Sequence, residues 1–180
     1  SSMAFSQSQS GFEADIRRNL EREPDILTTT ESVQFSGVFD RVCRSMGYTP
    51  VQHQFKACRI AVRTSEQGIG VKNQGRVFVL NGKAGVYPDK TINWVVVNFY
   101  GVTLYHHVAH WVPKNSPNYH ENHRKITNAM VTQVRLHGKK KNLSFFAGDI
   151  NEDDDPDGRL RGTRFNQIMR QGGLMTIWDE

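Results

Sequence analysis

One stretch of the sequence, residues 143–151, places two polar residues directly after an apolar segment. Leu143-Ser-Phe-Phe-Ala-Gly-Asp-Ile-Asn151 runs from apolar and small residues into Gly148, and Asp149 and Asn151 follow. The pattern predicts a buried strand whose C-terminal end presents a carboxylate and a carboxamide. On an extended backbone, side chains two positions apart point to the same side, so both groups would face one target. Gly148 has no Cβ atom and would let that target approach closely.

The same residues also encode a strand that ends in an Asx-type turn, in which a side-chain oxygen bonds the nearby backbone. A carboxylate beside a carboxamide suits a hard cation and a phosphate oxygen, whereas an Asx turn is structural. Both interpretations stay open at this point.

Helical and strand patterns alternate along the chain. Apolar residues at helical spacing predict helices at 12–20, 35–46, 119–137 and around 165–172. Runs rich in β-branched and aromatic residues predict strands at 25–30, 57–64, 76–80, 91–99, 102–111 and 143–149, with another beginning at 174–178. The glycine-punctuated segment 66–75 is expected to link two strands, and Tyr100-Gly101 to form a hairpin turn. Helices interspersed with many strands predict a layered α/β (α+β) domain.

Length and composition fit a single globular domain. The chain has 180 residues, 37% of them hydrophobic and 23% charged, and is long enough to bury a core. We expect residues 1–11, rich in Ser and Gln, to form a flexible tail and residues 12–180 to form the domain. No run of 18 apolar residues occurs, and the N-terminal segment has no basic and apolar regions of a signal peptide. We therefore expect an intracellular protein, cytoplasmic or nuclear, with no membrane partner.

Four polar residues fall at or directly after the predicted C-terminal ends of strands: Glu31, His110, Asp149 and Asn151. Open α/β sheets bind ligands in crevices outside these strand ends. Glu31 and Asp149 would hold Mg²⁺ or Mn²⁺ through oxygen atoms. Asn151 would bond a phosphate oxygen or orient a water molecule, and His110 would donate a proton or a hydrogen bond to the phosphate. Taken singly, each is better explained as a surface polar residue at a strand end.

Basic residues favour an anionic partner, with nucleic acid first. The net charge is +5 and the sequence pI about 9.4. Arg159, Arg161 and Arg164 follow the predicted site directly and are the candidates for contacts with substrate phosphates. Lys139 and Lys140, in a run that ends at Lys141, are candidates for contacts with a phosphate backbone.

Other clusters point less specifically to a ligand. Asp153, Asp155 and Asp157 match the first half of a calcium loop, but Arg164 stands where the bidentate Glu belongs, so an acidic surface loop is expected. His106 and His110 share a predicted strand face without a third zinc ligand at helpful spacing. His120 and His123 are expected to be exposed residues at a helix start. Cys43 and Cys58 have no CxxC spacing and are expected in the core.

Three short segments, in order, resemble motifs of the endonuclease/exonuclease/phosphatase superfamily, the DNase I-like metal-dependent phosphodiesterases. Pro24-Asp-Ile-Leu-Thr-Thr-Thr-Glu31 is similar to the "PDIL…QE" segment, which supplies a metal-binding Glu. Val108-Ala-His110-Trp111 is similar to the "THL" segment, whose His contacts the scissile phosphate. Phe146-Ala-Gly-Asp-Ile-Asn151 resembles the "GDFN" motif, whose Asp and Asn serve the nucleophile and phosphate. The resemblance covers roughly residues 12–178 by motif order and spacing.

The resemblance implies a four-layer αββα sandwich and a Mg²⁺- or Mn²⁺-dependent nuclease. Two family segments are not found in residues 1–180: the first strand ending in a "WN" Asn, and the final "SDH" segment with its Asp–His pair. Thr30 and Ala109 replace the usual Gln and Thr of the motifs. The resemblance therefore implies an incomplete sandwich, either a fragment or a trimmed domain, whose sheet a further segment or chain would complete. Two alternatives stay open: a non-catalytic nucleic-acid-binding or assembly module, and a lipid or nucleotide phosphatase.

Overall fold

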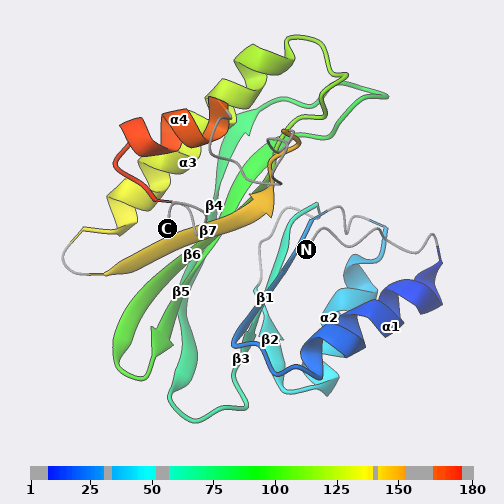
Figure 1. The fold of residues 1–180 in the computed structure, drawn as a ribbon. Coiled ribbons are helices and arrows are strands. Elements are labelled where there is room, and N and C mark those ends of the chain that lie inside the picture. Colours follow the sequence, from blue (N-terminus) through cyan, green and yellow to red (C-terminus); the bar gives the residue numbers. More distant parts are fainter. Residues whose placement is uncertain (1–7, 31–33, 52–56, 140–141, 153–163, 176–180) are drawn as a thin grey trace.

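Two β-sheets lie face to face in the computed structural model, with a pair of helices on each outer side (Figure 1). The structure describes residues 8–30, 34–51, 57–139, 142–152 and 164–175. The first sheet has the strand order β1-β3-β2, and the second has the order β4-β5-β6-β7. The elements are α1 (Gln9–Leu20), β1 (Ile26–Thr29), α2 (Ser36–Ser45), β2 (Tyr48–Pro50), β3 (Arg59–Arg63), β4 (Ile69–Leu80), β5 (Lys90–Phe99), β6 (Val102–His110), α3 (Tyr119–His137), β7 (Leu143–Asp149) and α4 (Arg164–Gln171). This is the α+β, four-layer αββα arrangement expected from the sequence.

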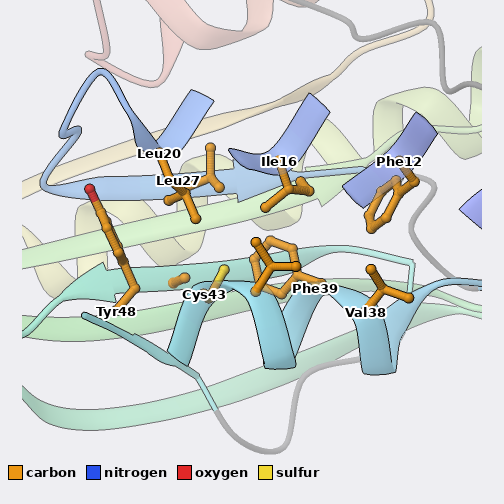
Figure 2. Packing of buried hydrophobic residues seen from close by; sticks show 10 residues of the cluster. Phe12, Ile16, Leu20, Leu27, Val38, Phe39, Cys43 and Tyr48 are labelled. Atoms are coloured by element: carbon orange, nitrogen blue, oxygen red, sulfur yellow. The ribbon is translucent and has the colours of Figure 1, made fainter. Parts of the chain in front are cut away.

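Helices α1 and α2 cover the outer face of the first sheet. The predicted stripe of α1, Phe12, Ile16 and Leu20, is buried against α2 and the sheet (Figure 2). Helix α1 begins at Gln9, three residues before the expected start at Phe12, because Ser8 Oγ accepts a hydrogen bond from Gly11 N at 3.2 Å and caps the helix. The expected tail at 1–11 therefore reaches into the helix, and residues 1–7 lie outside the described residues.

The second sheet has a core on each of its faces. Toward the first sheet, Val95, Val97 and Val108 pack with residues of β3. On the opposite face, α3 and α4 bury a cluster around Trp111. The α3 side chains predicted to face the core, Ile126, Met130 and Val134, belong to this second cluster. Each sheet is therefore buried on both faces.

Strand β4 differs from the sequence expectation. It begins at Ile69 and runs through the segment expected to be a linker. Gly75 sits in the strand because the indole of Trp94, its partner on β5, occupies the space that a side chain would need. The short strand β2 was also not predicted. The predicted strand at 174–178 lies mostly outside the described residues.

The topology of β5, β6 and β7 sets the position of the polar residues. Strands β5 and β6 form the predicted hairpin, with positive φ angles of 48° at Tyr100 and 86° at Gly101, as a two-residue primed turn requires. Helix α3 crosses over from β6 to β7, so these two strands pair in parallel. Their C-terminal ends consequently lie side by side at one edge of the sheet.

One edge strand of each sheet, β1 in the first and β7 in the second, lies on the same side of the sandwich. Among the described strands, β1 and β7 each pair with one neighbour only, and contacts join them across the two sheets. Two large apolar side chains of β7, Leu143 and Phe145, are 57% and 39% exposed. No helix among the described residues is long and apolar enough to cross a membrane.

Candidate functional site

The candidate site begins where β6 and β7 end. His110 is the last residue of β6, and its partner in the parallel register is Asp149, the last residue of β7. His110 lies two positions after Val108, which packs between the sheets, so its side chain lies on that same face. His110 is buried and Asp149 is half-buried. The structure thus brings together an imidazole and a carboxylate that are 39 residues apart in the sequence.

Asn151 follows in a tight turn. Its φ angle is +50°, in the left-handed region that Asn tolerates better than most residues. Its backbone N–H donates to Asp149 Oδ1 at 3.0 Å, which is the Asx-type turn that the sequence left open. The extended geometry also considered for Asp149 and Asn151 is therefore wrong, because the strand ends at Asp149. The two side chains are neighbours through a turn rather than along one strand face.

Two side chains of helix α3, one helical turn apart, donate hydrogen bonds to this turn. Tyr119 donates its hydroxyl to the carbonyl oxygen of Asn151 at 2.7 Å. His123 Nε2 donates to the carbonyl oxygen of Ile150 at 2.9 Å. His123 is 3% exposed, so the expectation that it is an exposed helix-start residue is wrong, whereas His120 is exposed as expected. His123 is buried because the turn offers its ring a hydrogen-bond acceptor.

The carbonyl group of Trp111 anchors the side chain of Asn151. Trp111 O accepts one hydrogen bond from Asn151 Nδ2 and another from Lys90 Nζ, each at 3.0 Å. The ring of Trp111 is in turn fixed by a 2.9 Å hydrogen bond from Nε1 to Thr127 Oγ1. Lys90 is only 3% exposed, although a Lys is among the residues least often buried. Sequence reasoning missed Lys90, Tyr119 and the role of His123, because nothing local in the sequence signals their burial.

His110 is held in its neutral form. The pKa of its imidazole is lowered to about 4, mainly by burial and also by the positive charge of Lys90, while the charge of Asp149 opposes the shift. At pH 7 the ring consequently carries one proton and offers one donor and one acceptor. It is suited to donate a hydrogen bond rather than to act as a cation.

The other predicted site residues are placed differently. Glu31 lies outside the described residues, two positions after the end of β1. Arg159, Arg161 and Lys140 also lie outside the described part of the chain. Arg164 is the first residue of α4, and its side chain is not described. This end of α4 is tied to the site, because Glu152 Oε2 accepts a hydrogen bond from Phe165 N at 2.9 Å.

Lys139 is not brought to the site. It is exposed and precedes β7, whereas Asp149 ends that strand. Seven residues of strand separate the two ends of β7, which corresponds to about 20 Å. Lys139 therefore lies near the opposite end of the sheet, and its contact with a phosphate backbone stays a prediction.

The alternative metal sites gain no support. The acidic loop with Asp153, Asp155 and Asp157 lies outside the described residues. Within the described ranges, no group of three or more His, Cys, Asp or Glu side chains is arranged to hold a metal ion. Cys43 and Cys58 are free and buried, as expected, and burial raises the pKa of each thiol to about 12. Neither is suited to act as a nucleophile.

The chemistry of the described donors suits a hard divalent cation. Asp149 supplies carboxylate oxygens at the sheet edge, and its Oδ1 already accepts the turn hydrogen bond of Asn151. Such oxygen donors are those that Mg²⁺ and Mn²⁺ prefer. For a second carboxylate, the sequence predicts Glu31.

Comparison with solved structures identifies the fold. A scan of the sequence against protein-family models finds no match, and a search of curated proteins finds none either. A humanized form of D. rerio TDP2 with 14 mutations matches with a TM-score of 0.67 at 14% identity, over 94% of this chain and 62% of that chain. D. rerio TDP2 in complex with a single-strand DNA product matches with a TM-score of 0.64 at 14% identity, over 92% and 58%.

Two proteins of Bacteroides thetaiotaomicron match similarly. An endonuclease/exonuclease/phosphatase family protein has a TM-score of 0.65 at 12% identity, over 88% of this chain and 58% of that chain. The mannosyl-6-phosphatase Bt3783 has a TM-score of 0.63 at 13% identity, over 86% and 61%. The chain therefore has the DNase I-like fold, and it spans about three fifths of the length of these structures.

Proposed function

We propose that this chain is a divalent-metal-dependent phosphoester hydrolase, with a phosphodiester of nucleic acid as its substrate. The pairing of His110 with Asp149 at the ends of β6 and β7, in a chain with the DNase I-like fold, carries the proposal. Structures of this fold include hydrolases named for different phosphoesters, among them a mannosyl-6-phosphatase. The proposal of a hydrolase therefore rests on fold and site together, and the choice of nucleic acid rests on separate observations.

In this proposal, the described residues have separate roles in the in-line attack of water on phosphorus. Neutral His110 donates a hydrogen bond to a non-bridging phosphate oxygen, where negative charge develops in the transition state. The Asn151 carboxamide directs its nitrogen to Trp111 O, which leaves Oδ1 as the acceptor for a proton of the attacking water. The hydrogen bonds from Tyr119 and His123 hold the turn that carries Asn151, so its position is set before substrate arrives.

Asp149 and Glu31 are the residues that would hold Mg²⁺ or Mn²⁺. When bound, the cation would supply positive charge against the phosphate oxygens. Asp149 meets this requirement with a half-buried carboxylate whose orientation is fixed by the turn. The role of Glu31 follows from its place after β1 and from the motif it resembles.

Charge and similarity support nucleic acid as the substrate. The chain carries a net charge of +5, which favours a polyanion. D. rerio TDP2, with the same fold, has been solved with a single-strand DNA product. Arg159, Arg161 and Arg164 are the proposed phosphate contacts close to the site, and Lys139 and Lys140 are the proposed contacts at the far end of β7.

The exposed apolar side chains of β7 favour a further strand beside it. Leu143 and Phe145 are 57% and 39% exposed on a strand that pairs with β6 alone among the described strands. An unpaired edge with apolar side chains is a template for pairing. We therefore propose a further segment or chain as the element that completes this side of the sandwich.

A substrate panel separates the candidate functions. The purified chain is incubated with supercoiled plasmid, a single-stranded oligonucleotide, a p-nitrophenyl diester and a p-nitrophenyl monoester, each with Mg²⁺, Mn²⁺ or EDTA. Metal-dependent cleavage of the nucleic acids and the diester supports the proposal. Hydrolysis of the monoester alone would replace it with a phosphatase. Salt-sensitive DNA binding by folded protein without cleavage would replace it with a binding module.

A further inference from the structure

Lys90 is a buried ammonium group for which the hydrolysis described above has no direct use. It is the first residue of β5 and is 3% exposed. Moving a charged group out of water costs several kcal/mol unless hydrogen bonds and neighbouring charges compensate it. A buried Lys at the edge of a candidate site therefore calls for a reason in the site itself.

The contacts of Lys90 connect it to Asn151 through one backbone atom. Lys90 Nζ and Asn151 Nδ2 both donate to Trp111 O, each at 3.0 Å. Strands β5 and β6 are antiparallel, and Asn93 pairs with Val108. Three residues further along this register, Lys90 lies opposite Trp111. The side chain of Lys90 also packs over the ring of Tyr87, with Nζ 5.6 Å from the ring centroid. These contacts fix Nζ between the end of β6 and the loop that precedes β5.

The shared acceptor gives Asn151 one orientation. A carbonyl oxygen only accepts hydrogen bonds, so the amide nitrogen of Asn151, and not Oδ1, faces Trp111. Trp111 N also donates to the carbonyl oxygen of Asp149 at 2.9 Å, so the same peptide segment spans both predicted site residues. Lys90 donates to the Trp111 carbonyl oxygen from the side of β5, so one oxygen receives both hydrogen bonds.

We propose that Lys90 is a positioning residue, which orients the Asn151 carboxamide through the Trp111 carbonyl for attack on the phosphoester. The inference rests on the proposed hydrolase function for its kinetic consequence and on hydrogen-bond geometry alone for its structural consequence. Lys90 does not touch the substrate in this scheme. Its loss should therefore lower kcat and leave KM almost unchanged, because binding of the phosphate group is not its task.

A double-mutant cycle in kcat tests this coupling. Lys90→Met removes the donor and the charge and keeps the length of the side chain. We expect it to lower kcat about 10- to 100-fold with KM changed less than about twofold. The same change made in Asn151→Ala should have an effect smaller than about threefold, because the group through which Lys90 acts is already gone. Lys72→Met on β4, whose Nζ lies 3.5 Å from Thr103 Oγ1 and is exposed, is the matched control.

The NMR signals of the Asn151 side-chain amide give a second readout that does not need catalysis. Lys90→Met should shift and broaden these signals, whereas Lys72→Met should leave them unchanged. If Lys90→Met does not fold, Lys90→Arg, which keeps a donor and the charge, should retain the signals and at least part of kcat. If the wild type hydrolyses no phosphoester, the proposed function fails, and the NMR comparison still decides the role of Lys90. Unchanged Asn151 signals in folded Lys90→Met, or equal effects of Lys90→Met in both backgrounds, would overturn the inference.

Discussion

Gly148, on β7, packs directly against the backbone of β6 because it has no side chain. A Cβ atom at this position would overlap the carbonyl oxygen of Ala109 and would lie 3.0 Å from the Trp111 ring. The sequence suggested that this glycine allows a ligand or another backbone to come close, and the neighbour is the backbone of β6. The glycine thus brings Asp149 and His110 together.

Gly148→Ala should consequently destabilise the protein by about 1–3 kcal/mol, because β7 must move away from β6. The measurement is the free energy of unfolding from urea denaturation. Gly37→Ala on α2 is the control, since a Cβ there has no atom within 4 Å, and alanine is the better helix former. The account of the strand contact fails if Gly148→Ala is as stable as Gly37→Ala.

At the level of helices and strands, local patterns predict an element well when its own periodicity determines its burial. The stripe at Phe12, Ile16 and Leu20 identifies α1, and the range of α3 is predicted correctly. The glycines of segment 66–75 predict a link between two strands, whereas the structure has β4 there, and Trp94 of the neighbouring strand requires a glycine at Gly75. That requirement appears only when β4 and β5 are paired.

The candidate site shows the same division. The positions of His110, Asp149 and Asn151 at or just after strand ends could be predicted because an apolar run precedes each of them. Lys90 and His123 could not, because their partners are the carbonyl groups of Trp111 and Ile150, distant in sequence. Such contacts depend on how β5, β6 and α3 meet, and no local spacing encodes them.

The exposed edge of β7 gives a prediction about association. Leu143→Thr with Phe145→Thr keeps residues suited to a strand and removes the exposed apolar surface. We expect this double variant to self-associate less than the wild type at the same concentration, as measured by analytical ultracentrifugation. Leu136→Thr, which removes an apolar side chain that is 52% exposed on α3, is the control. Equal association of all three proteins would argue that β7 is not a pairing edge.

For the molecule as a whole, buried histidines on β6 make stability depend on pH, and His106 and His107 add to the effect of His110. Burial lowers the pKa of His106 to about 3, with His107 contributing, and burial lowers the pKa of His107 to about 4. For His107, the Phe145 carbonyl opposes the shift and His137 adds to it. Because that carbonyl accepts from His107 Nδ1 at 2.9 Å, the neutral ring uses Nε2 to accept from His137 Nδ1 at 2.8 Å.

Both histidines are neutral in the folded and unfolded states well above pH 6.5. Below that pH the unfolded chain binds protons that the folded chain excludes, so stability falls as the pH decreases toward 4. Each histidine contributes a slope of about 1.4 kcal/mol per pH unit in this window. Urea denaturation at several pH values measures the slope.

Substitution of His106 isolates its share of this slope. His106→Leu should remove the contribution of one histidine, and the exposed His120→Gln is the control that leaves the buried pair in place. The ring nitrogens of His106 have no hydrogen-bond partner among the described residues, so leucine replaces the ring without breaking a hydrogen bond. A slope in His106→Leu equal to that of the wild type would contradict the assignment.

The most direct measurement of the central claim is the metal-dependent rate of phosphodiester hydrolysis by Asp149→Asn. Asparagine keeps the oxygen that accepts the Asn151 N–H and removes the charge that would hold the cation. Asp15→Asn on α1, on the opposite side of the first sheet, is the matched control. We predict that Asp149→Asn folds normally and loses at least about 10²-fold in kcat/KM, whereas Asp15→Asn retains the wild-type rate. A wild-type rate measured for Asp149→Asn, in a preparation shown to contain no contaminating nuclease, would contradict the account.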